Sequence, residues 1–245
     1  MKEKIRTLFI SDVHLGNKKS NPEILLEVFD KYQFDKLIII GDFIDLTSLS
    51  KKMYWKNSHS KVIQKILKFS RKGTEVIYIL GNHDYYLREL IKNGNINLGN
   101  ILICDEYIHQ TLSKETIYIC HGDVFDGFVA LNPILYKLGD WAYEFSFKLS
   151  RVYNSIRKLF GLKNWSLSKY LKKKVKNAIS YVNDFKTISM KKIQETKTNS
   201  IMMGHIHTPE IILGDYNYYN TGDFCESCSY IIEDLNGDIK LKIFS

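Results

Sequence analysis

The chain has 245 residues, of which 44% are hydrophobic and 25% are charged, as in ordinary globular proteins. This length fits one domain of the larger kind with a sizeable insertion, so we expect a single domain over residues 1–245. No apolar stretch is long enough to span a bilayer, and the first expected strand begins too close to Met1 to leave room for a signal peptide. We therefore expect a cytoplasmic protein.

The formal net charge is +8, and one segment concentrates positive charge. No acidic residue lies between Glu144 and Asp184, whereas the interval holds Lys148, Arg151, Arg157, Lys158, Lys163, Lys169, Lys172, Lys173, Lys174 and Lys176. Subtracting these ten charges from +8 leaves the rest of the chain near −2. A solvated surface is the ordinary explanation. The alternatives are contact with an anionic membrane surface, a phosphate-bearing substrate or nucleic acid.

The first half of the chain alternates expected strands and helices, which predicts a parallel sheet. A strand over 5–10 precedes a helix that begins at Asn21-Pro22 and a strand over 36–40. After a polar, irregular stretch over 47–60, we expect a helix that ends near Gly73, a strand over 75–80 and a helix that begins at Asp84. Short strands follow over 101–104 and 116–120.

The second half contains a different kind of segment. Apolar residues recur at helical spacing over 145–160 and again over 167–185, which predicts two amphipathic helices inserted within residues 128–193. The chain then returns to expected strands over 200–203, 210–213, 216–220, 230–234 and 239–244. Asn236-Gly237 predicts a hairpin turn between the last two.

Polar side chains follow five of the expected strands directly. They are Asp12 and His14; Asp42 and Asp45; Asn82, His83 and Asp84; His121 and Asp123; and His205 and His207. Strands of one sheet would bring these ends together at the carboxyl edge, where open α/β sheets bind ligands. Carboxylate, imidazole and amide groups with almost no thiol favour Mn, Fe or Zn.

The ordered motifs D-x-H, G-D-x-x-D, G-N-H-D, H-G-D and G-H-x-H resemble those of the calcineurin-like metallophosphoesterase superfamily. The resemblance implies an α+β fold, a four-layer α/β/β/α sandwich, here with a helical lid insertion at about 128–193. It also implies two divalent metal ions, with Mn as the first choice and Fe, Zn or Mg as alternatives. Two such ions can clamp a phosphoryl oxygen and activate a water molecule.

The same resemblance assigns roles to individual residues. One ion would be held by Asp12, His14, Asp42 and His207, and the other by Asp42, Asn82, His121 and His205. His83 would protonate the leaving oxygen or stabilise the transition state, oriented by Asp84. Asp45 and Asp123 would support the ligands through hydrogen bonds.

Further segments resemble the UDP-2,3-diacylglucosamine diphosphatase-like branch, namely 55–59, 138–143, 165–168, 174–178 and 220–228. The branch cleaves a lipid-linked nucleotide diphosphate to UMP and lipid X in lipid A biosynthesis. Asn82, Trp55, His59 and Lys174 would then contact substrate. The alternative for Trp55 is that it packs against the following helix. The basic lid would shelter acyl chains and contact an anionic membrane surface, placing the protein peripherally on the inner membrane.

Two other functions remain open at this stage. The same metal site could serve a phosphodiesterase for nucleotides or nucleic acid, with the basic lid as a strand groove. Alternatively, a protein of this fold that has lost its metals could act as a scaffold. The complete set of ligand types argues against the scaffold.

Overall fold

The computed structural model describes residues 2–92, 94–126 and 189–244. The chain divides into two compact units, one comprising Met1–Val124 with Ser189–Ser245 and the other Phe125–Ile188. Most of the predicted lid over 128–193, including Lys174, lies outside the described residues. All the motifs that follow the expected strands belong to the first unit.

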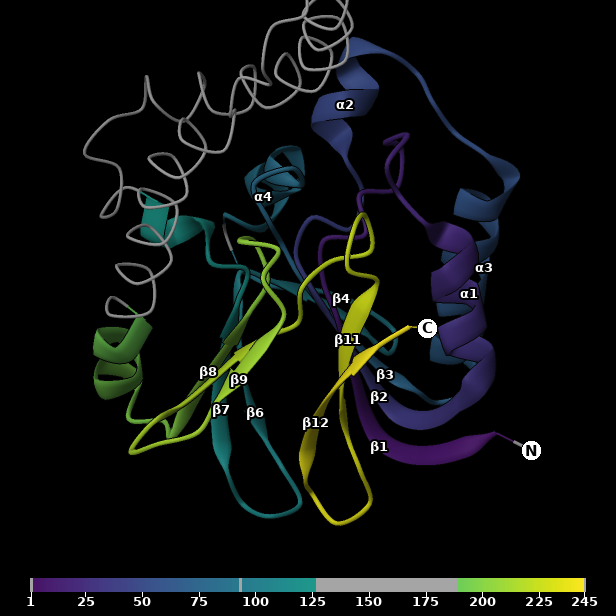
Figure 1. Cartoon of the computed structure of the whole chain (residues 1–245). Coiled ribbons are helices and arrows are strands. Elements are labelled where there is room, and N and C mark those ends of the chain that lie inside the picture. The colour runs from purple at the N-terminus through teal and green to yellow at the C-terminus, as the bar shows by residue number, and fades with distance from the viewer. Residues whose placement is uncertain (1, 93, 127–188, 245) are drawn as a thin grey trace, which may run out of the picture. The chain divides into compact units, whose positions relative to one another are not determined.

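Two sheets form the centre of the first unit (Figure 1). The first has the order β12-β11-β1-β2-β3-β5-β4, with β1 Glu3–Ile10, β2 Tyr32–Ile40, β3 Glu75–Ile79, β4 Ile96–Leu98, β5 Ile101–Cys104, β11 Ser229–Glu233 and β12 Ile239–Ile243. The second has the order β6-β7-β8-β10-β9, with β6 Glu106–Gln110, β7 Thr116–Cys120, β8 Ser200–Met203, β9 Glu210–Ile212 and β10 Asn217–Asn220. Within the first sheet β1, β2, β3 and β5 are parallel, and so are β7, β8 and β10 in the second.

The strand β2 shows how a central strand is buried on both faces by consecutive apolar residues. In β2, Leu37 and Ile39 belong to a core beneath the helices α1 (Pro22–Lys31) and α3 (Asn57–Arg71). Ile38 and Ile40 point the other way, into a second core shared with residues of the second sheet such as Ile119. A continuous apolar run is therefore the sequence signature of this strand.

A helical segment covers the outer face of the second sheet. Residues 189–196 are helical, and Ser189 Oγ lies 3.9 Å from the Met203 sulfur. The Lys192 ammonium lies 5.4 Å from the centre of the Tyr118 ring, and Ile193 is buried. Helices thus flank both sides of the paired sheets, which confirms the predicted α+β class and its α/β/β/α layers.

Local differences from the sequence expectations have simple causes. The stretch over 47–60 is not irregular: α2 spans Leu46–Lys51 because the Asp45 carboxylate accepts a hydrogen bond from Ser48 N at 2.7 Å and so caps the helix. The strands β4 and β6 were not expected, since each is short and mixes polar with apolar residues. The helix α4 (Tyr85–Ile91) follows Asp84 as predicted, and a short 3-10 turn η1 spans Asp123–Phe125. Gly237 turns the predicted hairpin with a φ of 88°.

Candidate metal centre

The polar residues of the five motifs converge where parallel strands of both sheets end. Asp12, Asp42 and Asn82 follow β1, β2 and β3 of the first sheet, whereas His121 and His205 follow β7 and β8 of the second. The expectation that one sheet would bring them together is wrong, because the chain crosses to the second sheet between β5 and β6. The cluster instead bridges two stacked sheets.

The Asp42 carboxylate lies between histidines from the two sheets. Its Oδ2 atom is 3.3 Å from His121 Nε2 and 3.7 Å from His14 Nε2. His121 Nε2 is in turn 3.2 Å from Asn82 Oδ1. One carboxylate with imidazoles on two sides is the arrangement that a ligand shared by two cations requires.

Asp12 gathers a second group of ligand atoms. Its Oδ1 atom is 3.1 Å from His207 Nε2 and 3.9 Å from His14 Nε2, and its Oδ2 atom accepts a hydrogen bond from His205 N at 3.0 Å. Asp12 is fully buried, yet Oδ1 has no hydrogen-bond partner. A buried carboxylate oxygen without a partner costs free energy unless a cation occupies the space beside it.

Several residues of the cluster lie close enough together to hold a common metal ion. Three groups place one ligand atom from each member within 4.8 Å of the others, namely Asp12 with His14 and His207, Asp12 with Asp42 and His121, and His14 with Asp45 and His83. The first two groups contain only residues predicted as metal ligands. The His205 ring lies 5.0 Å from the His121 ring, centre to centre. The donor set of carboxylates and imidazoles therefore fits divalent metal ions.

The backbone at this edge is strained. Five of the seven predicted metal ligands have positive φ: Asp12 (49°), His14 (50°), Asp42 (50°), His205 (65°) and His207 (52°). Residues other than glycine rarely adopt this conformation, and each such residue costs free energy that the surrounding structure must offset. Such strain accumulates at functional sites, and here it turns successive side chains inward.

Glycines in the motifs leave room for the ligands. A Cβ atom at Gly204 would lie 2.2 Å from Asp12 Oδ2, and one at Gly81 would lie 2.2 Å from Asp42 Oδ1. At Gly41 it would lie 2.3 Å from His121 Nδ1, and that glycine also has a φ of 72°. In these three motifs the glycine is thus required by the carboxylate or imidazole packed against it.

The electrostatics of the cluster also suit a cation. Burial lowers the pKa of His121, but the Asp42 and Asp12 carboxylates outweigh burial and raise that pKa to about 10. Burial likewise lowers the pKa of His207, which Asp12 raises to about 9. The pKa of the Asp42 carboxyl is held far below its usual range, since His121 and His14 outweigh its desolvation. Divalent metal ions bound by these imidazoles would balance the charge of the same carboxylates.

His83 is oriented by Asp45, so the predicted role of Asp84 is wrong. His83 Nδ1 and Asp45 Oδ1 are 2.9 Å apart. The buried Asp84 carboxylate instead accepts hydrogen bonds from Tyr78 Oη at 2.6 Å and from Gly81 N at 3.1 Å. It therefore closes the loop that carries Asn82, and burial raises its pKa to about 6. His83 Nε2, 4.0 Å from Asp42 Oδ2, remains beside the metal ligands.

The predicted substrate contacts at Trp55 and His59 differ from what the structure shows. His59 is completely buried, and Trp55 Nε1 donates a hydrogen bond to Ser60 Oγ at 2.9 Å within α3. The two rings lie 5.1 Å apart in an edge-to-face contact. These contacts match the alternative in which Trp55 packs against the following helix. A side chain with no exposed surface is not available to a ligand, so His59 in this conformation serves packing.

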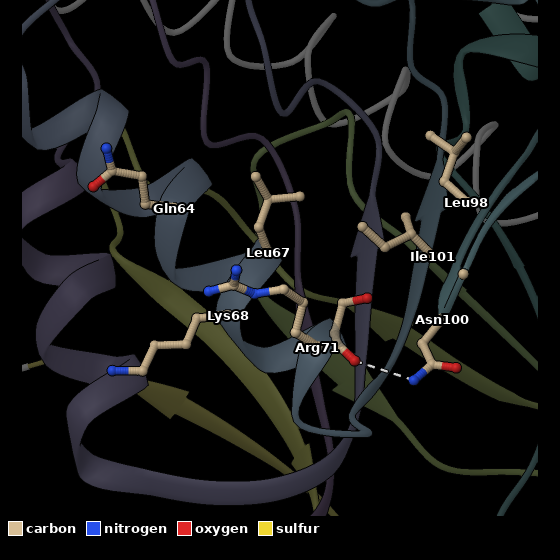
Figure 2. Close-up of a pocket in the computed structure, with 9 residues that line it drawn as sticks. Gln64, Leu67, Lys68, Arg71, Leu98, Asn100 and Ile101 are labelled. Carbon is tan, nitrogen blue, oxygen red and sulfur yellow. Dashed lines mark hydrogen bonds between the residues drawn. The ribbon is translucent and has the colours of Figure 1, made fainter.

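A groove elsewhere on the described unit lacks this chemistry. Figure 2 shows a groove of about 850 Å³ between α3 and the turn that joins β4 to β5. Gln64, Lys68 and Arg71 line one side, and Leu98 and Ile101 the other. None of the residues that line it belongs to the five motifs.

The chain contains a second basic stretch in addition to the one between Glu144 and Asp184. Between Asp45 and Glu75 the chain has no acidic residue but carries Lys51, Lys52, Lys56, Lys61, Lys65, Lys68, Arg71 and Lys72. The interpretation that one segment accounts for the basic character is therefore wrong. The ammonium groups of Lys18 and Lys56 each lie 5.9 Å from the centre of the Tyr54 ring.

A family model decides the relationship that these motifs suggest. The model described as calcineurin-like phosphoesterase matches residues 5–209, which include every predicted metal ligand. The chain belongs to the calcineurin-like phosphoesterase family. It is therefore a hydrolase of phosphoric esters, and membership implies that divalent metal ions occupy the Asp–His cluster.

Three individual proteins illustrate how similar this chain is to other sequences. A UDP-2,3-diacylglucosamine hydrolase from Wigglesworthia glossinidia brevipalpis is 27% identical over 217 residues, covering 84% of this chain and 80% of that protein. One of the same name from Histophilus somni (strain 129Pt) is 28% identical over 48% of this chain and 49% of its own. The uncharacterized metallophosphoesterase YkoQ of Bacillus subtilis is 29% identical over 40% of this chain and 37% of its own.

One further finding concerns membranes. Among the residues that the structure describes, no helix combines the length and the apolarity needed to cross a bilayer.

Proposed function

We propose that this metallophosphoesterase hydrolyses the diphosphate of UDP-2,3-diacylglucosamine, releasing UMP and lipid X, with two divalent metal ions at the centre around Asp42. The observation that carries the two-ion centre is the Asp42 carboxylate, 3.3 Å from His121 Nε2 on one side and 3.7 Å from His14 Nε2 on the other. The substrate is inferred from the relative that matches 84% of the chain.

The ligand assignment follows the two sides of Asp42. Asp12, His14 and His207 would complete one site with Asp42, and Asn82, His121 and His205 the other. When bound, the ions would neutralise charge on the phosphoryl oxygens and activate water, and Mn is the ion that we expect. The proposal is supported by two groups, Asp12 with His14 and His207, and Asp12 with Asp42 and His121, whose ligand atoms lie within 4.8 Å of one another.

The other roles in the proposed reaction are proton donation and the orientation of side chains. His83, held by Asp45, would donate a proton to the oxygen of the leaving group. Burial lowers the pKa of His83, but Asp45 and Asp42 outweigh burial and raise that pKa, which favours the protonated imidazole that this step requires. Asn82 would contact both a metal ion and the substrate phosphate. Asp84 acts indirectly by closing the loop that carries Asn82.

The test is turnover of a substrate panel by the Mn-loaded protein. The panel comprises UDP-2,3-diacylglucosamine, dinucleotides, single-stranded DNA and p-nitrophenyl phosphodiesters, with products identified by mass spectrometry. We expect UMP and the acylated sugar phosphate from the first compound, at a kcat/KM at least about 100-fold above the others. Reaction in ¹⁸O water would identify the phosphorus that water attacks. Equal or faster cleavage of the other compounds would contradict the lipid assignment.

A specific observation supports a second candidate, a phosphodiesterase for nucleotides or nucleic acid. Tyr54 stands between Lys18 and Lys56, which is an aromatic ring among cations of the kind that binds single strands. The panel separates the candidates directly. Preferential cleavage of DNA, with an affinity that falls steeply as salt rises, would favour this function over the lipid substrate.

The proposal extends to the segment over 128–193, which would act as a helical lid inserted in a single domain of residues 1–245. Its apolar faces would shelter acyl chains, and Lys174 with its neighbours would meet the diphosphate or the anionic leaflet of the inner membrane from the cytoplasmic side. Replacement of Lys172, Lys173 and Lys174 by glutamate should then weaken binding to anionic liposomes. Unchanged liposome binding and turnover would contradict the lid role.

A further inference from the structure

Arg88 of α4 forms a cluster of hydrogen bonds that no motif predicts. Its guanidinium donates to both carboxylate oxygens of Asp123, from Nη1 at 2.5 Å and from Nη2 at 3.0 Å. Nη2 also donates to the Leu80 carbonyl at 2.9 Å, and Nε donates to Asp105 Oδ1 at 3.1 Å. The guanidinium is thus committed to three separate segments, and the Asp123 side chain that it holds is only 10% exposed.

These partners lie beside two predicted metal ligands that come from different sheets. Leu80 precedes Asn82 by two residues at the end of β3 in the first sheet. Asp123 follows His121 by two residues after β7 in the second sheet. Asn82 Oδ1 and His121 Nε2, which are 3.2 Å apart, have been assigned to the same metal ion. The Arg88 fork therefore spans the gap between the two loops that carry them.

The position of α4 makes this link rigid. Asp84, immediately before the helix, accepts a hydrogen bond from Gly81 N and is itself fully buried. Arg88 lies four residues later, on the same side of the helix. The loop over 81–84 is thus fixed at its start by Asp84 and tied to the His121 loop by Arg88. Lysine could not reproduce this geometry, because only guanidinium offers a planar fork with several donors.

We propose that Arg88 is a positioning residue that sets the separation of Asn82 and His121 and thereby completes one of the two metal sites. The inference rests on the two-ion centre of the proposed function, but not on the identity of the substrate. The site formed by Asp12, His14 and His207 has no contact with Arg88 among the described residues. Loss of the Arg88 hydrogen bonds should therefore weaken metal binding at the site of Asn82 and His121 more than at the other site.

The experiment measures Mn binding by calorimetry and by metal content in the wild type, Arg88→Lys and Asp123→Asn. Arg6→Lys is the matched control, since Arg6 forms an exposed ion pair with Asp35 at 3.1 Å away from the motifs. We expect the wild type to bind two ions. Both variants should bind one ion with an affinity close to that of the wild type and the second roughly 10–100-fold more weakly. Thermal unfolding of the metal-free proteins confirms that each variant is folded.

The following results distinguish failure of the positioning role of Arg88 from failure of the two-ion centre. The double variant Arg88→Lys with Asp123→Asn should lose no more affinity than the worse single variant, because both changes break one link. Two ions bound by Arg88→Lys with unchanged affinity would overturn the positioning role, as would equal weakening of both sites. A wild type that binds a single ion would overturn the two-ion centre together with the role of Arg88. Asp123→Asn supplies the test if Arg88→Lys does not fold.

Discussion

Two buried clusters of carboxylates and imidazoles join the two sheets, and they differ in how their charges are balanced. Beside the middle of β1, Glu233 accepts hydrogen bonds from Thr7 Oγ1 at 2.7 Å and from Leu112 N at 2.8 Å, and it lies 2.8 Å from His109 Nε2. Both Glu233 oxygens are satisfied, and its backbone belongs to a regular strand. The protein's own groups thus satisfy both carboxylate oxygens of this cluster, although His109 Nδ1 is buried without a hydrogen-bond partner.

The cluster around Asp42 is incomplete by the same standard. Asp12 Oδ1 and His14 Nδ1 are buried without hydrogen-bond partners, and the ligand residues adopt positive φ. The two clusters therefore differ in their carboxylates, since protein atoms satisfy both oxygens of Glu233 but leave Asp12 Oδ1 without a partner. The contrast indicates that the first cluster stabilises the fold, whereas the second holds its side chains in readiness for metal ions at a cost to stability.

Asp42→Asn should have the largest effect. The amide keeps the shape but removes the charge that two cations would share, so we expect turnover of a p-nitrophenyl phosphodiester to fall by at least about 10³-fold. The metal-free variant should unfold at a lower temperature than the wild type, because, despite desolvation, His121 and His14 hold the pKa of the Asp42 carboxyl low and so stabilise its charged form in the folded protein. Asp35→Asn, at an exposed ion pair, is the matched control. Wild-type turnover by Asp42→Asn would remove Asp42 from the centre.

His83→Asn comes next, with an expected loss in kcat of roughly 10²–10³-fold while both metal ions remain bound. Asp45→Asn should cause a smaller loss in the same direction, since Asp45 orients the His83 ring at 2.9 Å. Substrates with a p-nitrophenol leaving group need little protonation and should show a smaller defect. If kcat falls equally for good and poor leaving groups, His83 does not act as the proton donor.

Gly204→Ala should weaken metal binding about 10–100-fold, because the added methyl group would lie 2.2 Å from Asp12 Oδ2 and displace that ligand. Gly214→Ala is the matched control, since the nearest atom to its added methyl group lies at 3.9 Å. Calorimetric titration with Mn measures both. Equal affinities in the two variants would show that the glycine is not required for the Asp12 geometry.

Glu233→Gln should leave metal binding and turnover unchanged but lower the free energy of unfolding by about 1–3 kcal/mol. Burial raises the Glu233 pKa, but hydrogen bonds from His109 and Thr7 outweigh it and hold the pKa below its usual value. The carboxylate therefore contributes stability above the unfolded pKa of about 4.3, and this contribution is lost as pH falls through the folded pKa. The difference between the variant and the wild type should shrink below about pH 4 in urea denaturation. A difference independent of pH would show that ionisation of Glu233 has no part in the link.

The motifs could be predicted from the sequence because each places a small residue and a metal-ligand side chain at the end of an apolar strand. Gly81 and Gly204 follow apolar runs, and the same local pattern predicts both the turn and the inward side chain. The role predicted for Asp84 was wrong, because Asp45 and Asp84 each end a motif and only packing shows which carboxylate meets His83. Arg88 carries no sequence signal, because its partners Asp105 and Asp123 are distant in the chain.

The central claim is that Asp42 is shared by two metal ions, and anomalous diffraction from Mn-containing crystals tests it most directly. We expect two peaks roughly 3.5–4 Å apart, both within coordination distance of the Asp42 carboxylate. One peak should also contact Asp12, His14 and His207, and the other Asn82, His121 and His205. A single peak at saturating Mn, or two peaks of which only one touches Asp42, would contradict the account.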